Sequence, residues 1–202
     1  MLKTGFVYST IIDPLLANLR KRLALEIRSG EHVIDIACGT GTQLFYLATK
    51  AATVTGVDLS ESMVKFAVKN AEEKNISNAS FYVADATDLS SFYSQTFDAA
   101  ILSMALHQFS PELHQPILSE IKKIAKRIVI LDYAIPLPKN YAGVASKVAE
   151  FLAGKEHHRN FKSYAKMGGL DAILSSNDFK IHKSKRIGKG AFQLVVAQNH
   201  SV

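Results

Sequence analysis

The sequence predicts an α/β protein built on a doubly wound, mostly parallel sheet with helices on both faces. Strand and helix patterns alternate five times between residues 32 and 132, which is typical of parallel strands joined by right-handed crossovers. The strand segments are short and β-branched, and the run Ile128–Asp132 is rich in Val, Ile and Leu, as in strands buried on both faces. A Gly-x-Gly turn, Gly39–Gly41, follows the first strand and leads into a helix.

Each predicted strand is a short run of apolar and β-branched residues bounded by turn residues. Seven such runs are His32–Ile36, Thr53–Asp58, Ser80–Ala84, Phe97–Met104, Ile128–Asp132, Phe179–Ile187 and Phe192–Ala197. The sequence pattern leaves their order in the sheet open.

The predicted helices combine apolar residues at helical spacing with recognisable starts and stops. Asp13 and Pro14 begin one that Gly30 ends, and Ser60 caps one whose inner face carries Met63, Val64, Ala67, Val68 and Ala71. The others are expected over Thr42–Lys50, from Ser110 to about Lys126 with an irregular first turn at Pro116, over Gly143–Ala153, and over Phe161–Ser175.

The composition is that of an ordinary globular domain. Apolar residues make up 48% and charged residues 21% of 202 residues, so we expect a single domain spanning 1–202. No apolar run reaches the ~18 residues of a membrane span, and the N-terminus has no secretory pattern. Cys38 is the single cysteine. We therefore expect a cytoplasmic protein, in which Cys38 is a small packed residue rather than a reactive thiol.

The net charge is +6, and part of the excess clusters in two stretches, 122–127 and 180–189. Such clusters attract nucleic acid or an anionic substrate, or they are a solvated helix end and a polar strand face. Few aromatic residues are interleaved for base stacking, which argues against nucleic acid as a partner.

Acidic and small residues follow three consecutive strands. Asp35 precedes the glycines Gly39 and Gly41, Asp58 stands 17 positions after Gly41, and Asp85 follows the third strand. The carboxyl ends of parallel strands form the ligand site of open α/β sheets. A carboxylate at Asp58 can accept hydrogen bonds from both hydroxyls of a ribose.

The same acids and glycines have simpler interpretations when taken singly, as solvated turn acids and tight-turn glycines. Their joint placement favours a nucleoside-type cofactor. Leu44 occupies the third glycine position of the dinucleotide fingerprint, which weakens a pyrophosphate-binding interpretation. Apolar walls for a base are expected from Leu59, Met63 and Ala86.

Four segments, Val33–Thr42, Gly56–Ser60, Ala84–Leu89 and Phe97–His107, resemble the successive motifs of class I S-adenosylmethionine-dependent methyltransferases. They are most similar to the small-molecule branch that includes ubiquinone and menaquinone biosynthesis methyltransferases. The resemblance implies a Rossmann-like seven-stranded sheet with an antiparallel last strand. It also implies S-adenosylmethionine as cofactor, with S-adenosylhomocysteine as product.

The resemblance also assigns roles to cofactor-binding residues. Asp35, Gly39 and Gly41 would line the methionine part, Asp58 would bind the ribose, and Asp85 with Ala86 would bind the adenine. Ser103 and Met104 would flank the methyl-bearing sulfur. Residues 1–30 would contain a helix that covers the cofactor. Tyr8 would stack beside the sulfonium, with hydrophobic anchoring of the terminus as the competing interpretation.

The sequence gives fewer indications of which residues contact the methyl acceptor. His107 follows the fourth strand and is the candidate general base, with a loop histidine bonded to backbone as the alternative. Tyr133 and Asp132 end the fifth strand and can shape an acceptor pocket. Residues 136–176 are expected to form a lid in which His157, His158 or Arg159 contacts the acceptor.

The adjacent histidines also suggest a metal site with His107 or His114, but neighbouring side chains point in different directions, so no metal is expected. The predicted function is methyl transfer to a small-molecule acceptor by in-line displacement. The alternatives are an RNA or protein methyltransferase and a non-catalytic S-adenosylmethionine-binding protein.

Overall fold

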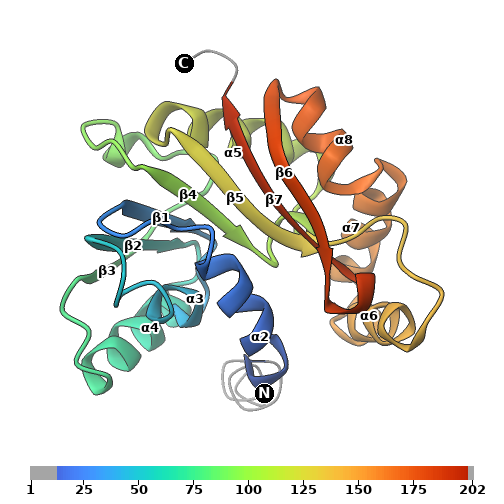
Figure 1. The fold of residues 1–202 in the computed structure, drawn as a ribbon, viewed down its shortest axis with the longest axis horizontal. Helices are drawn as coiled ribbons and strands as arrows, with labels where there is room; N and C mark the ends of the chain where they lie inside the picture. Colours follow the sequence, from blue (N-terminus) through green and yellow to red (C-terminus); the bar gives the residue numbers. More distant parts are fainter. Residues whose placement is uncertain (1–12, 200–202) are drawn as a thin grey trace.

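A computed structural model describes residues 13–199 of the chain. Its centre is a seven-stranded sheet in the order β3-β2-β1-β4-β5-β7-β6 (Figure 1). The strands are β1 (His32–Ile36), β2 (Thr53–Asp58), β3 (Ala79–Val83), β4 (Ala99–Ser103), β5 (Arg127–Tyr133), β6 (Phe179–Ile187) and β7 (Phe192–Asn199). All neighbouring pairs are parallel except those of β7, which is antiparallel to both β5 and β6. The doubly wound sheet with one antiparallel strand is confirmed.

Helices cover both faces of the sheet. The α-helices are α2 (Asp13–Ala24), α3 (Thr42–Phe45), α4 (Glu61–Glu73), α5 (Pro111–Ile124), α6 (Tyr141–Leu152), α7 (Lys155–Lys166) and α8 (Gly169–Ser176). Within residues 13–199, the 3-10 turns are η2 (Ser90–Phe92) between β3 and β4, η3 (Leu106–Gln108) between β4 and α5, and η4 (Gly188–Gly190) between β6 and β7.

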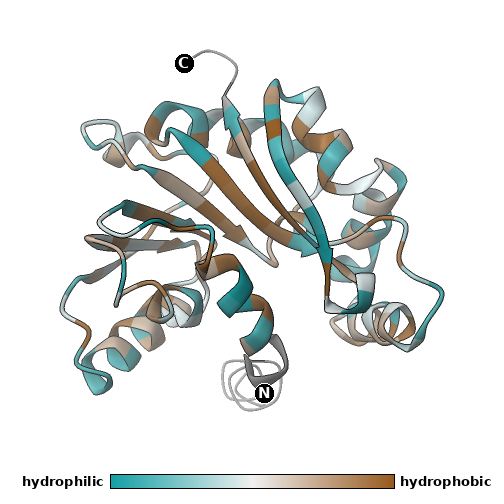
Figure 2. Ribbon diagram, viewed as in Figure 1, coloured by the Kyte–Doolittle hydropathy of each residue, from teal (hydrophilic) through white to brown (hydrophobic). Residues whose placement is uncertain are grey.

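The core consists of two apolar layers separated by the sheet. Successive residues of β1 alternate between them, because strand side chains point to opposite faces: Ile34 and Ile36 join one cluster and Val33 joins the other. The first cluster includes apolar residues of α5, α7 and α8, and the second includes those of α2 and α3. Figure 2 shows the resulting apolar stretches along the central strands.

Several helices differ in length from the prediction. The helix α2 ends at Ala24 rather than near Gly30, and α3 spans four residues instead of reaching Lys50. After α3 the chain continues in turns, and the Asn78 side chain donates to the carbonyls of Ala48 and Ala51 at 2.8 and 3.1 Å. This side chain supplies the partners that a longer helix would have provided through its own backbone.

The predicted helix over Phe161–Ser175 is two helices. Gly168, between α7 and α8, and Gly169, the first residue of α8, have φ values of 93° and 72°, a left-handed conformation that glycine adopts without steric strain. By contrast, α5 continues through Pro116.

Candidate functional site

A cavity of about 280 Å³ lies at the carboxyl ends of β1, β2 and β4. Its walls come from the loop after β1, the β2–α4 junction, the end of β4 and the helix α2. The lining residues are Arg20, Asp35, Ala37, Cys38, Gly39, Thr40, Thr42, Gln43, Asp58, Ser60, Met63, Ser103, Met104, Ala105, Gln108 and Phe109. This is the edge of the sheet at which the sequence predicts a ligand site.

The loop after β1 has an irregular backbone that Asp58 holds in place. Ala37, Gly39 and Gly41 all have positive φ, at 57°, 55° and 72°. The Asp58 carboxylate accepts hydrogen bonds from the backbone N–H of Gly39 at 2.8 Å and of Ser60 at 2.9 Å. One side chain therefore connects the β1 loop to the start of α4. A Cβ on Gly39 would meet no atom within 4 Å, so this part of the loop borders open space.

Gly41 and Gly56 are needed for packing beneath the loop. A Cβ on Gly41 would lie 2.7 Å from Cε1 of Phe81. A Cβ on Gly56 would lie 2.7 Å from Phe81 Cδ1 and 2.8 Å from the Sγ atom of Cys38. Cys38 is buried, and burial together with the charges of Asp35 and Asp58 raises the pKa of its thiol. A protonated, packed thiol matches the expected structural role.

Asp35 is the buried acid of the cavity. Its residue exposure is 1% and its Oδ1 atom has no hydrogen-bond partner. Burial raises the pKa of Asp35 well above its ordinary value, and the charge of Asp58 adds to this effect, while the guanidinium of Arg20 opposes it. An unpartnered buried carboxylate oxygen is energetically costly, so the site suits a ligand that brings a hydrogen-bond donor or a positive charge.

The end of β4 forms the opposite wall. Met104 has a φ of 56°, which is uncommon for a residue with a side chain. Its backbone N–H donates to Leu131 at 2.7 Å, and its carbonyl accepts from Nε2 of Gln108 at 2.5 Å. These bonds fix the turn between β4 and η3, at which Ser103 and Met104 reach the cavity.

The structure brings six of the predicted cofactor residues to the cavity: Asp35, Gly39, Asp58, Met63, Ser103 and Met104. The remaining four in the described chain do not line it. Gly41 packs against Phe81 beneath the loop. Leu59 is 71% exposed, and Asp85 is exposed and accepts hydrogen bonds from the backbone and hydroxyl of Thr87. Ala86 packs against the adjacent apolar cluster. Tyr8 lies outside the described residues.

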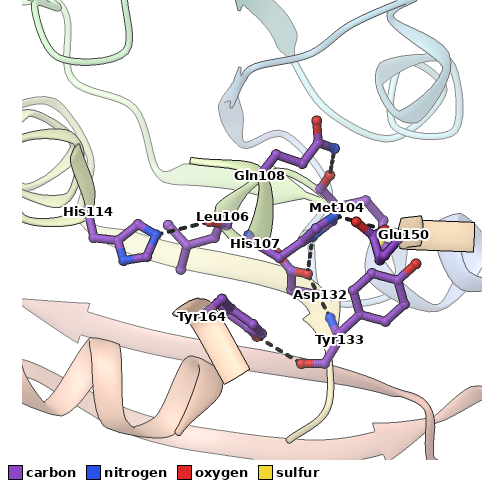
Figure 3. Close-up of polar contacts among 9 residues, drawn as sticks. All are labelled: Met104, Leu106, His107, Gln108, His114, Asp132, Tyr133, Glu150 and Tyr164. Atoms are coloured by element: carbon purple, nitrogen blue, oxygen red, sulfur yellow. Dashed lines mark hydrogen bonds and ion pairs between the residues drawn. The ribbon is translucent and has the colours of Figure 1, made fainter. Parts of the chain in front are cut away.

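His107 is buried beside the cavity rather than on its surface (Figure 3). Its Nδ1 donates to Oδ1 of Asp132 at 2.5 Å, and its backbone N–H donates to the other oxygen at 3.1 Å. Its Nε2 lies 3.4 Å from Oε1 of Glu150 on α6. Burial lowers the pKa of His107, but the two carboxylates outweigh burial and raise it to about 9. The imidazole is therefore charged at neutral pH and bonded on both sides.

Aromatic rings enclose the same imidazole. Tyr133, Phe161 and Tyr164 surround it edge-on, with ring centroids 4.8 to 6.4 Å away. The Tyr164 hydroxyl donates to the carbonyl of Tyr133 at 2.8 Å. His114, raised with His107 as a metal candidate, donates its Nε2 proton to the carbonyl of Leu106 (Figure 3). The ring of His107 thus bonds two carboxylate side chains rather than backbone, which the alternative prediction did not anticipate, and its role as a base stays a hypothesis.

The predicted acceptor residues do not form a common pocket with the cavity. Tyr133 is 4% exposed and stacks on Phe192. His158 contacts the ring of Phe151, whereas the Arg159 side chain is exposed, with a long contact of 4.0 Å to Glu156. His157 is half-buried in α7. Among residues 13–199, no group of three acidic, histidine or cysteine side chains is arranged to hold a metal ion.

Sequence reasoning missed Arg20, Gln43, Gln108 and Glu150. The first three line the cavity, and Glu150 is buried against His107. Arg20 belongs to the segment 1–30 that was expected to cover the cofactor, but nothing in the sequence singles out this residue, and Glu150 belongs to a helix far from the motifs in sequence. Gln108 directly follows His107, and its proximity to the end of β4 was the available signal.

The first basic stretch is largely paired within the fold, and the second is paired in part. Lys123 bonds Glu120, Lys126 lies 2.7 Å from Asp98, and Arg127 lies 2.5 Å from Glu31. Lys183 lies 2.7 Å from Glu26, and Arg186 donates to the carbonyls of Ile135 and Pro136. These contacts leave less free positive charge than the sequence suggests. In the described part of the chain, no helix is long and apolar enough to cross a membrane.

The strand order, the antiparallel β7 and the cavity at the strand ends define a Rossmann-like methyltransferase fold. A family model described as a methyltransferase domain matches residues 27–186, and the chain belongs to this family. A solved structure of an S-adenosylmethionine-dependent methyltransferase from Aquifex aeolicus superposes with a TM-score of 0.70 at 18% identity. It covers 96% of this chain and 98% of that protein.

Curated relatives match over shorter segments. The chain is 34% identical over 109 residues to a demethylmenaquinone methyltransferase of Clavibacter sepedonicus, which is 54% of this chain and 43% of the relative. It is 43% identical over 61 residues to a 23S rRNA (uracil(1939)-C(5))-methyltransferase of Hahella chejuensis, which is 30% of this chain and 14% of the relative. The matches thus cover less than half the length of either relative.

Proposed function

We propose that this protein transfers a methyl group from S-adenosylmethionine to a small-molecule acceptor. Membership of the methyltransferase family supports the reaction class. The observation that carries the cofactor assignment is the convergence of Asp35, Asp58 and the Ser103–Met104 turn on one cavity at the strand ends. The match to a demethylmenaquinone methyltransferase spans 54% of this chain, against 30% for the match to an rRNA methyltransferase, and this larger coverage favours a small-molecule acceptor.

The cavity suits the amino-acid and ribose parts of the cofactor in charge and in hydrogen-bond acceptors. Asp35 offers a buried carboxylate oxygen without a partner, which suits the ammonium of the methionine part. Arg20 supplies a positive charge on the same wall for the carboxylate of that part. Asp58 would accept from the ribose hydroxyls, because each of its oxygens has a second lone pair beyond its backbone bond.

The bound cofactor would supply a methyl group already activated by the positive sulfonium. The chain's own task is then alignment and exclusion of water. Met104 and Ser103, held by the bonds of Gln108 and Leu131, form the rigid wall toward which the acceptor would approach. We infer that His107 stabilises this wall through Asp132 and Glu150, and a base is needed only for a hydroxyl or protonated amine acceptor.

Calorimetry with S-adenosylhomocysteine tests the cofactor assignment. The wild-type chain is expected to bind, and Asp58→Asn is expected to weaken binding at least about tenfold, since it removes charge-assisted acceptors for the ribose. Asp88→Asn is the matched control, because Asp88 is an exposed acid that caps the backbone of Ser90. Unchanged affinity in Asp58→Asn would remove the ribose assignment.

A second assay separates acceptor classes. Release of S-adenosylhomocysteine is measured against a panel of quinols, phenols and other small metabolites, with folded RNA as the competing class. Turnover with RNA but no small molecule would contradict the small-molecule proposal. Cofactor binding without turnover on either class would indicate a non-catalytic binding protein.

A further inference from the structure

The helix α6 is amphipathic, but its apolar face points to solvent and its polar face points into the protein. Its buried residues are small or charged, namely Gly143, Ser146 and Glu150. Its apolar residues face solvent instead, with exposed fractions of 51 to 75% for Tyr141, Val144, Val148, Phe151 and Leu152. At about 100° per residue these five residues form one stripe opposite the buried side, which we call the α6 stripe. An exposed contiguous apolar surface of this kind marks an interaction site.

The inward contacts of α6 explain why the stripe points outward. Glu150 is held by His107, and the Cβ position of Gly143 lies only 2.0 Å from the carbonyl oxygen of Pro138. Asn140 caps the helix by accepting from the N–H groups of Ala142 and Gly143. Rotating α6 to bury the stripe would break all of these contacts, so the stripe is a fixed feature of the fold.

The surroundings of the stripe are positively charged. Lys139, Lys147 and Lys155 are exposed before, within and after α6. Lys189 is exposed beside its N-terminus, where the carbonyl of Lys189 accepts from Asn140 Nδ2 at 3.0 Å. Between residues 133 and 170 the acidic residues are Glu150, which is buried, and Glu156. In the view of Figure 1, α6 lies at the lower rim of the molecule, below the β7–β6 end of the sheet.

We propose that the α6 stripe and its flanking lysines dock onto an anionic lipid bilayer. An apolar helix face bordered by lysines lies in the bilayer interface, where it buries its side chains ~5–10 Å deep, and each nearby lysine is attracted by anionic headgroups. A second copy of the chain fits less well. One helix of 12 residues offers a narrow strip, short of the ~800 Å² per partner of stable interfaces, and two such faces would oppose like charges. This inference does not depend on the proposed reaction.

Flotation with lipid vesicles tests the proposal on the full chain. Vesicles of phosphatidylcholine alone are compared with vesicles containing about one third phosphatidylglycerol. The wild-type chain is expected to bind the anionic vesicles in about 0.1 M salt. Its binding should be weaker in about 1 M salt, where the charges are screened.

Two pairs of variants separate the apolar and the charged contributions. Phe151→Ser is compared with Leu25→Ser, because the two residues are 68% and 69% exposed. Phe151→Ser is expected to lower vesicle partition about tenfold, and Leu25→Ser is expected to leave it unchanged. Lys147→Glu should weaken binding to anionic vesicles more than Lys180→Glu, whose side chain is exposed away from α6 on β6.

The outcomes are distinguishable. Absence of wild-type binding to anionic vesicles in low salt overturns the proposal, as does equal binding by Phe151→Ser. A wild-type dimer in sedimentation that Phe151→Ser abolishes, without vesicle binding, overturns it in favour of a second copy. Thermal unfolding of each variant verifies that these exposed substitutions leave the fold intact.

Discussion

His107 and Asp132 form two hydrogen bonds to each other, one from the imidazole Nδ1 and one from the backbone N–H of His107. Because Asp132 lies in β5 and His107 lies in η3 after β4, this pair joins the ends of two neighbouring strands. Glu150 extends the pair to α6. The arrangement places one positive charge between two buried negative ones, which makes the cluster sensitive to pH.

The stability of the protein should fall as the pH rises toward 10. The folded-state pKa of His107 is about 9, above the ordinary 6.5, so its contribution is fully present below pH 6.5 and is lost as pH rises through 9. The expected loss is on the order of 3 kcal/mol. Urea unfolding from pH 6 to 10 measures it. His107→Gln should make the free energy of unfolding depend less steeply on pH. His182→Gln, at an exposed position on β6, should leave the pH dependence unchanged. Equal slopes in all three proteins would refute the charged imidazolium.

Asp35→Asn should separate apo stability from cofactor binding. Removing the buried carboxylate with its unpartnered oxygen is expected to raise the free energy of unfolding by about 1 kcal/mol. The same change should weaken S-adenosylhomocysteine binding at least about tenfold, because a charge-assisted hydrogen bond to the ammonium is lost. Methylthioadenosine lacks that ammonium and provides the control. If both ligands weaken equally in calorimetry, Asp35 does not contact the amino-acid part.

Gly41→Ala should destabilise the protein more than Gly30→Ala. Both glycines have positive φ, 72° and 80°, so both substitutions incur a similar backbone cost of about 1 kcal/mol. A Cβ at Gly30 meets no atom within 4 Å, whereas one at Gly41 meets Phe81 at 2.7 Å and Ala67 at 3.0 Å. Overpacking is therefore expected to add roughly 1–3 kcal/mol at Gly41. Denaturant midpoints of the two variants give the comparison, and similar midpoints would contradict the close packing.

Replacing Arg127 alone should lower the free energy of unfolding more than replacing Arg127 together with its partner Glu31. Arg127 and Glu31 are mostly buried at 8% and 11% side-chain exposure. Arg127→Met leaves Glu31 as an unpaired buried charge, at a cost of roughly 3–5 kcal/mol. The double variant Glu31→Gln/Arg127→Met should recover part of this loss. The exposed pair Lys65–Glu61 provides the comparison, because Lys65→Met should change stability by under ~1 kcal/mol. A double-mutant cycle in urea tests the coupling.

The strands and the acid–glycine signature were predictable because both are local patterns. β1 and β2 have the predicted bounds, and Asp35, Gly39 and Asp58 reach one cavity because parallel strands deliver their carboxyl ends to one edge. Strand order was not predictable, since it depends on pairing between distant segments. The roles of Arg20 and Glu150 were not predictable for the same reason, since only tertiary packing brings these two residues to the site.

Burial was the other quantity that the sequence could not supply. Asp58 ends its strand, whereas Asp85 and His107 come a few residues after theirs. Asp85 turns outward onto Thr87 and His107 turns inward onto Asp132. The direction of each side chain depends on the turn that follows its strand. Likewise, the apolar spacing of α6 predicts a helix, but its outward apolar face results from the inward anchoring of Glu150.

The position of β7 between β5 and β6 has a consequence for how the molecule is assembled. β6 is made before β7 but can join the sheet only through it, since β6 pairs with β7 and not with β5. Until Phe192–Asn199 is synthesised, β5 presents an edge of unpaired backbone N–H and C=O groups with which strands of other chains can pair. Closure of the sheet is thus a late, non-local event in synthesis. A polypeptide that stops short of Phe192 should aggregate rather than persist as a smaller stable fold.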